Sequence, residues 1–113
     1  MRLIMRDIYD LLLDIKERYY MYTGGYDIFR LHSFIYGYLY AKRELGLEET
    51  EQEKDFSHFH EWLQKKYNLR TNNSWSNIIF FLSIDERRDV ESFYELLEEF
   101  IDRDRATEVD SSK

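Results

Sequence analysis

The stretch "DIFRLHSFIYGYLYAKRELG", residues 27–46, decides the fold class, because it is typical of one continuous helix. Asp27 suits an N-cap position, and Gly46 stands where a glycine often follows the last helical turn. Gly37 lies inside this helix, where a glycine costs about 1 kcal/mol relative to alanine. We therefore expect another helix or a bulky side chain to approach Gly37 closely. Apolar side chains recur at helical spacing between the two ends, at Leu31, Phe34, Ile35, Tyr38, Leu39 and Leu45.

The rest of the chain also favours helices, since it has no proline and only four glycines. Apolar spacing predicts a helix over residues 3–22, which ends at Gly24 and Gly25, and another over 55–68. The apolar run 78–82 fits a strand or a helix, but the sequence offers no second strand to pair with it. We therefore expect a short helix there, apolar all round and buried.

Two capping boxes mark helix starts along the chain. One pairs Thr50 with Glu53, and the other pairs Ser83 with Glu86 ahead of the last helix. The resulting prediction is an all-α protein, a single compact five-helix bundle with an aromatic-rich core. One domain is expected over residues 1–104, followed by a flexible polar tail at 105–113.

Composition limits the classes of function. The chain has 113 residues, no cysteine and a formal net charge of −7. A negative protein repels nucleic acid and attracts cationic partners. No signal peptide is recognisable at the start, and no apolar run is long enough to span a bilayer. We expect a cytoplasmic protein that binds neither membrane nor nucleic acid.

Catalytic and metal-binding patterns are missing from the sequence. His58 and His60 are two residues apart, so on a helix they point in different directions. The segment "HEWLQ", residues 60–64, begins like a zinc-protease motif but has Gln64 where the second histidine must stand. Ser33 follows His32 directly, and adjacent helical residues do not face each other. We expect no enzyme, no metal and no cofactor.

An acidic segment, "LEETEQEKD" at residues 47–55, offers two interpretations. It is either a solvated connector or a docking patch for a basic partner. Its carboxylates are Glu48, Glu49, Glu51, Glu53 and Asp55.

Tyrosines on the helix of residues 27–46 also allow two readings. Tyr38 falls on the apolar stripe, whereas Tyr36 and Tyr40, four residues apart, share a different side. A central helix would bury both sides. Otherwise Tyr36 and Tyr40 form an exposed surface suited to a protein partner, because tyrosine combines a large rigid ring with a polar tip.

The segment "FSHFHEWLQKKYNLRTNNSWSNIIFFLSIDERRDVESFYELLEEF", residues 56–100, resembles small acidic bacterial proteins of the immunity class. "FIYGYLYA", residues 34–41, is similar to the glycine-containing helix of such proteins. These proteins are encoded beside polymorphic or contact-delivered toxins and protect the producer by binding the toxin. The shared positions are packing residues, so the resemblance transfers no binding residue.

The leading hypothesis is therefore a cytoplasmic immunity protein that occludes the active site of a basic toxin, plausibly a nuclease. The acidic residues Glu48, Glu49, Glu51, Glu53 and Asp55 would steer the partner, and Tyr36 and Tyr40 would anchor it. Two alternatives stay open. One is a self-associating helical module with the tyrosines at a homodimer seam, and the other is an acidic mimic of nucleic acid.

Overall fold

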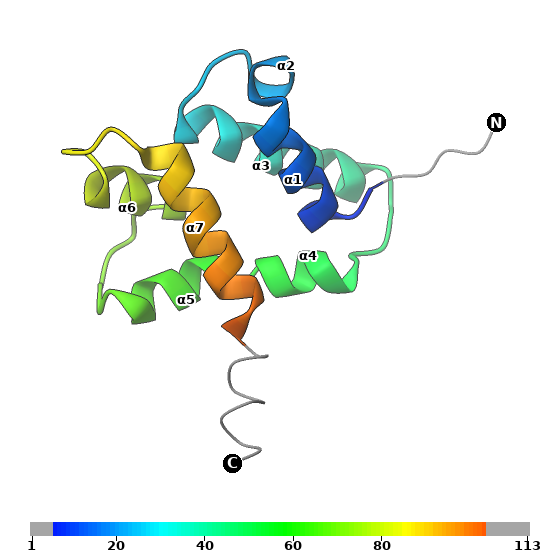
Figure 1. The fold of residues 1–113 in the computed structure, drawn as a ribbon. Helices are drawn as coiled ribbons and strands as arrows, with labels where there is room; N and C mark the ends of the chain where they lie inside the picture. Colours follow the sequence, from blue (N-terminus) through cyan, green and yellow to red (C-terminus); the bar gives the residue numbers. More distant parts are fainter. Residues whose placement is uncertain (1–5, 104–113) are drawn as a thin grey trace. The chain divides into compact units, whose positions relative to one another are not determined.

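The computed structural model describes residues 6–103, and every regular element in this range is a helix (Figure 1). The predicted all-α class is confirmed. The helices are α1 (Ile8–Glu17), α2 (Tyr19–Thr23), α3 (Ile28–Glu44), α4 (Glu51–Phe56), α5 (Phe59–Lys66), α6 (Trp75–Leu82) and α7 (Asp89–Ile101).

The expected count of five helices is wrong, because two expected helices are each divided. The first is interrupted at Arg18, whose backbone leaves the helical region at φ −129° and ψ 44°. The second is interrupted by a turn at residues 57–58 between α4 and α5. Gly24 ends α2 in the left-handed conformation, as the sequence predicts. The tail expected at 105–113 lies outside the described residues.

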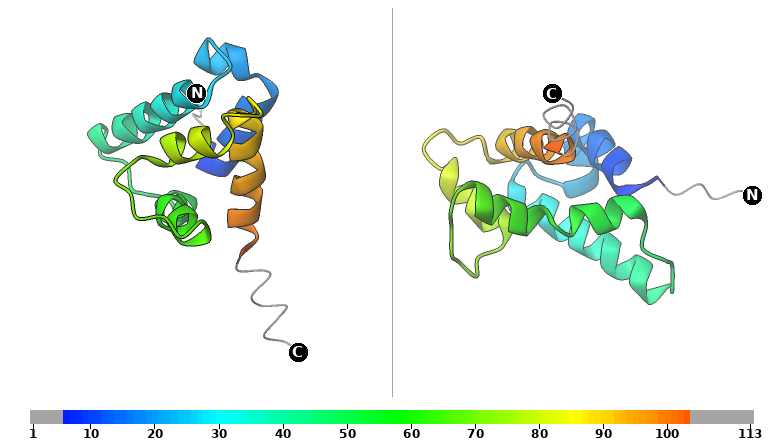
Figure 2. Two further views of the ribbon diagram at one scale, coloured as in Figure 1. Left: turned by 90° about the vertical axis from the view of Figure 1, so that its left-hand side faces the viewer. Right: turned by 90° about the horizontal axis from the view of Figure 1, so that it is seen from below.

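The chain forms two compact units, Met1–His58 and Phe59–Lys113. The prediction of one domain over residues 1–104 stays a prediction. In the first unit α1 packs against α2 and α4, and α2 packs against α3. Figure 2 shows the loop that leads from the long helix α3 into α4. The buried apolar side chains of this unit are Ile8, Leu12, Ile15, Tyr19, Ile28, Leu31, Ile35 and Phe56.

In the second unit α5, α6 and α7 pack against one another pairwise. Phe59 is fully buried at the centre of an aromatic cluster. Its ring centroid lies 5.4 Å from that of Phe100, 5.7 Å from Phe93 and 5.8 Å from Trp75, all with edge-to-face geometry. Such pairs add to the stabilisation from burial alone. The prediction of an aromatic-rich core therefore holds within this unit.

Around α6 the structure corrects two expectations. The run 78–82 is helical as predicted, but Phe81 is 62% exposed and Leu82 50% exposed, so the helix is not buried all round. The capping box of Ser83 and Glu86 is also wrong, since the last helix begins at Asp89. The Ser83 hydroxyl instead donates to the Ile79 carbonyl at 2.7 Å. Ser83 therefore caps the C-terminal end of α6.

The two glycines of the α3 region behave differently. Gly46 has φ +74°, its N–H donates to the Arg43 carbonyl at 3.0 Å, and the Leu47 N–H donates to the Lys42 carbonyl at 3.1 Å. This is the Schellman arrangement, and it confirms the predicted C-terminal glycine. At Gly37, however, an added Cβ would meet nothing within 4 Å. The expected close approach is wrong, because this side of α3 is open.

Replacement of Gly37 by alanine is expected to raise the free energy of unfolding by about 0.5–1 kcal/mol, since helical glycine has a high entropy cost. Gly46→Ala is the matched control, because its Cβ also meets open space but its φ of +74° strains any L residue. It is expected to lower the free energy of unfolding by about 1–2 kcal/mol. Urea unfolding measures both, and a destabilised Gly37→Ala variant would contradict the open helix face.

Candidate functional site

The N-terminus of α4 is built by the predicted capping box of Thr50 and Glu53. Thr50 Oγ1 accepts from the Glu53 N–H at 3.1 Å, and Glu53 Oε1 accepts from the Thr50 N–H at 3.0 Å. Thr50 Oγ1 also donates to Asp7 Oδ1 at 2.7 Å, and Asp7 is the N-cap of α1. The starts of two helices far apart in the sequence are thereby joined.

A buried ion pair links this cap to α3. Lys42 Nζ lies 2.6 Å from Glu53 Oε1, and the two side chains are only 10% and 5% exposed. The hydrogen bond to Glu53 raises the pKa of Lys42 above its usual value. Burial acts to raise the pKa of Glu53, but the hydrogen bonds from Lys42 and Thr50 outweigh it and hold that pKa below its usual value. We call Asp7, Lys42, Thr50 and Glu53 the polar network.

Tyr9 of α1 adds further contacts to α4. Its N–H donates to Gln52 Oε1 at 3.0 Å, and its hydroxyl donates to Asp55 Oδ2 at 2.6 Å. Its ring meets Phe56 edge-to-face at 6.4 Å. Asp55 is therefore half-buried, and its carboxylate is hydrogen-bonded within the first unit.

The predicted acidic patch divides into two groups. Glu53 is buried and Asp55 is half-buried, and each bonds to a side chain of another helix of the first unit. Glu48, Glu49 and Glu51 are exposed, and Glu51 pairs with Lys54 one helical turn later at 3.2 Å. Sequence reasoning did not separate these groups, because the partners of Glu53 and Asp55 are Lys42 and Tyr9, which lie on other helices.

The fold does not bury both sides of α3. Tyr36 is 69% and Tyr40 is 52% exposed, so both present their rings on the open side of α3. Tyr38 instead turns inward, and its hydroxyl donates to the Arg6 carbonyl at 3.0 Å. Leu45, which the sequence places on the apolar stripe, is wrongly expected in the core, since it is exposed directly after the same helix, as is Leu47.

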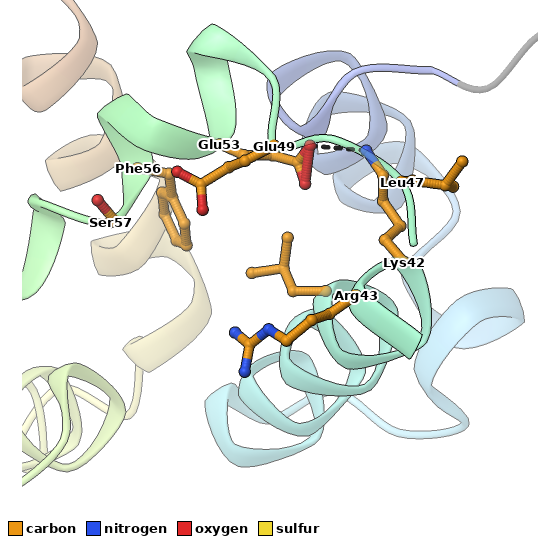
Figure 3. Close-up of a pocket in the computed structure, with 8 residues that line it drawn as sticks. Lys42, Arg43, Leu47, Glu49, Glu53, Phe56 and Ser57 are labelled. Atoms are coloured by element: carbon orange, nitrogen blue, oxygen red, sulfur yellow. Dashed lines mark hydrogen bonds and ion pairs between the residues drawn. The ribbon is translucent and has the colours of Figure 1, made fainter. Parts of the chain in front are cut away.

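A cavity of about 200 Å³ lies in the first unit beside the polar network (Figure 3). The α4 side supplies Glu53, Phe56 and Ser57. The α3 side and the following loop supply Leu39, Lys42, Arg43, Leu47 and Glu49. In Figure 3 the Arg43 guanidinium lies apart from the Lys42–Glu53 pair.

Residues 6–103 contain neither a cluster suited to a metal ion nor a helix suited to a membrane. Within this range no three histidine, aspartate or glutamate side chains gather closely enough to hold a metal ion. No helix in the same part of the chain has the length and apolar character needed to cross a bilayer. The candidate site consists of the exposed residues of α3 and its following loop, together with the cavity that Leu39, Lys42 and Arg43 help to line.

Lys42→Met would leave the Glu53 carboxylate buried without its partner, and we expect it to lower the free energy of unfolding by about 3–5 kcal/mol. The double variant Lys42→Met/Glu53→Gln removes both charges and keeps a side chain suited to the capping box, so it should recover most of this loss. Lys54→Met is the control, because its pair with Glu51 is exposed and is worth at most about 1 kcal/mol. Equal losses in Lys42→Met and Lys54→Met would contradict a buried pair.

The polar network also sets a pH dependence. Folding lowers the pKa of Glu53 from 4.5, so its contribution is complete above pH 4.5 and is lost as the pH falls through the folded-state pKa. Folding raises the pKa of Lys42 from 10.5, so its contribution is complete below pH 10.5 and is lost as the pH rises through the folded-state pKa. The stability difference between the native protein and the double variant should shrink at both extremes, as measured by urea unfolding across pH. A difference independent of pH would argue against the pair.

Comparison of the chain with protein-family models, with curated proteins and with solved structures gave no match. The immunity family expected from the sequence thus stays a prediction, and the functional conclusion rests on the residues of the site.

Proposed function

We propose that the protein is an immunity-type protein of the cytoplasm that binds a cognate bacterial toxin, a basic nuclease, and occludes its active site. The observation that carries this proposal is the exposure of Tyr36 and Tyr40 on one side of α3. Large aromatic side chains held exposed on a rigid helix are well suited to anchor a protein partner, because little conformational freedom is lost when they bind.

Charge supports a basic partner. Glu48 and Glu49 are exposed in the loop after α3, Glu51 begins α4, and the whole chain carries a net charge of −7. Such carboxylates accelerate the encounter with a cationic surface and fix its orientation more than they add affinity. In this mechanism the carboxylates steer the toxin and the two tyrosines hold it. No chemical step is required of this chain.

Affinity capture with the native chain from its source cells, at low and high salt, provides the first test. Each captured protein is then expressed in a bacterial host with and without this chain. We expect a basic protein that is released by salt, is toxic alone and is tolerated when this chain is present. Recovery of the chain alone, together with a dimeric mass in light scattering, would instead favour the self-associating module.

The double variant Tyr36→Ala/Tyr40→Ala is expected to weaken toxin binding by about 30-fold or more, the loss typical of interface anchors. Tyr20→Ala is the matched control, because Tyr20 is also 69% exposed but belongs to α2. Surface plasmon resonance measures both. If Tyr20→Ala loses as much affinity for the toxin as the double variant does, the assignment of Tyr36 and Tyr40 as anchors is overturned.

Reversal of the three exposed carboxylates tests steering separately. The variant Glu48→Lys/Glu49→Lys/Glu51→Lys should slow association at low salt by about tenfold or more and have little effect at high salt. Asp10→Lys/Glu17→Lys/Glu98→Lys changes the net charge equally at exposed positions elsewhere. If this control slows association as strongly, steering comes from net charge and not from residues 48–51.

A further inference from the structure

All asparagines of the chain lie between residues 68 and 77, in or beside the loop that connects α5 with α6. An asparagine loses its amide group when the backbone nitrogen of the next residue attacks the side-chain carbonyl carbon. The attacking nitrogen must first lose its proton, so an N–H that is held in a hydrogen bond reacts slowly. The bonding of the next N–H therefore distinguishes the asparagines from one another.

Asn68, Asn72 and Asn77 each precede an N–H that is already hydrogen-bonded. The acceptor in each case is an oxygen atom of the second unit. The bonds run from the Leu69 N–H to the Gln64 carbonyl at 2.9 Å, from the Asn73 N–H to Thr71 Oγ1 at 3.1 Å, and from the Ile78 N–H to the Ser74 carbonyl at 3.0 Å. Each bond must open before the nitrogen can react.

Asn73 differs, because the N–H that follows it is free. Ser74 is the N-cap of α6, so its hydroxyl and carbonyl oxygens accept from the first helical turn. Its own N–H lies ahead of that turn and donates to no group within residues 6–103. The Asn73 side chain is exposed, and in the same part of the chain it forms no hydrogen bond.

We propose that Asn73 is a site of spontaneous deamidation in the folded protein. The deprotonated Ser74 nitrogen attacks Asn73 Cγ and forms a five-membered succinimide ring, while Nδ2 takes up a proton and leaves as ammonia. Water then adds to one of the two ring carbonyl groups. Addition at Cγ opens the ring to aspartate, and addition at the backbone carbonyl opens it to isoaspartate. The small side chain of Ser74 leaves room for this ring closure.

The fold accommodates the product. Aspartate and isoaspartate each add one negative charge directly before Ser74, the N-cap of α6. The positive end of the helix macrodipole favours a negative charge at this place. The modified chain therefore stays folded, and it separates from the original chain on an anion-exchange column. The reaction needs only water and no partner protein.

Incubation of the full chain at neutral and at mildly alkaline pH, followed by tryptic digestion and mass spectrometry, tests this site. Residue 73 should be converted to aspartate and isoaspartate, faster at the higher pH because more of the attacking nitrogen is deprotonated. Asn72 and Asn77, which lie in the same tryptic peptide of residues 71–87, should stay intact. Asn73→Gln should leave this peptide unmodified, since ring closure from the longer side chain is slower.

Leu69→Ser supplies the matched control. It gives the exposed Asn68 the same serine neighbour that Asn73 has, and it keeps the backbone hydrogen bond to the Gln64 carbonyl. In the folded variant Asn73 should react about tenfold faster than Asn68 or more, because the bonded N–H must first be released. In urea the two rates should become similar. The proposal fails if Asn73 stays intact in the folded protein, or if Asn68 of the folded variant reacts as fast as Asn73.

Discussion

The ion pair between Lys42 and Glu53 is the interaction on which the first unit depends. Two charges removed from water are tolerated only when each is neutralised and hydrogen-bonded. Lys42 stands near the C-terminal end of α3, and Glu53 lies in the first turn of α4. The ion pair therefore holds the start of α4 against the end of α3. Through Thr50 the same carboxylate is tied to Asp7 and the start of α1.

This constraint also determines what the loop between α3 and α4 presents. The Schellman arrangement at Gly46 holds one end of the loop, and the capping box at Thr50 holds the other. The backbone of residues 47–49 is therefore constrained at both ends. Glu48 and Glu49 therefore remain on the surface, while Glu53, only a few residues later, is withdrawn into the interior.

The two sides of α3 accordingly have different roles. Leu31 and Ile35 are buried, and Lys42 joins the polar network, so this side supports the fold. Tyr36 and Tyr40 lie on the other side, where Gly37 also faces open space. A helix held firmly by one side fixes the backbone that carries these rings, which lowers the entropy cost of binding a partner.

The sequence by itself determined the all-α class, the N-caps at Asp27 and Thr50, and the glycine ends at Gly24 and Gly46, because these signals act between residues a few positions apart. Only the tertiary structure decided that Glu53 is buried, that Asp55 is half-buried, and that Tyr36 and Tyr40 are exposed. Lys42, eleven residues from Glu53, and Tyr9, forty-six residues from Asp55, leave no local pattern that would reveal these pairings. The open space at Gly37 likewise depends on which neighbours the folded chain brings near, and helical periodicity does not predict it.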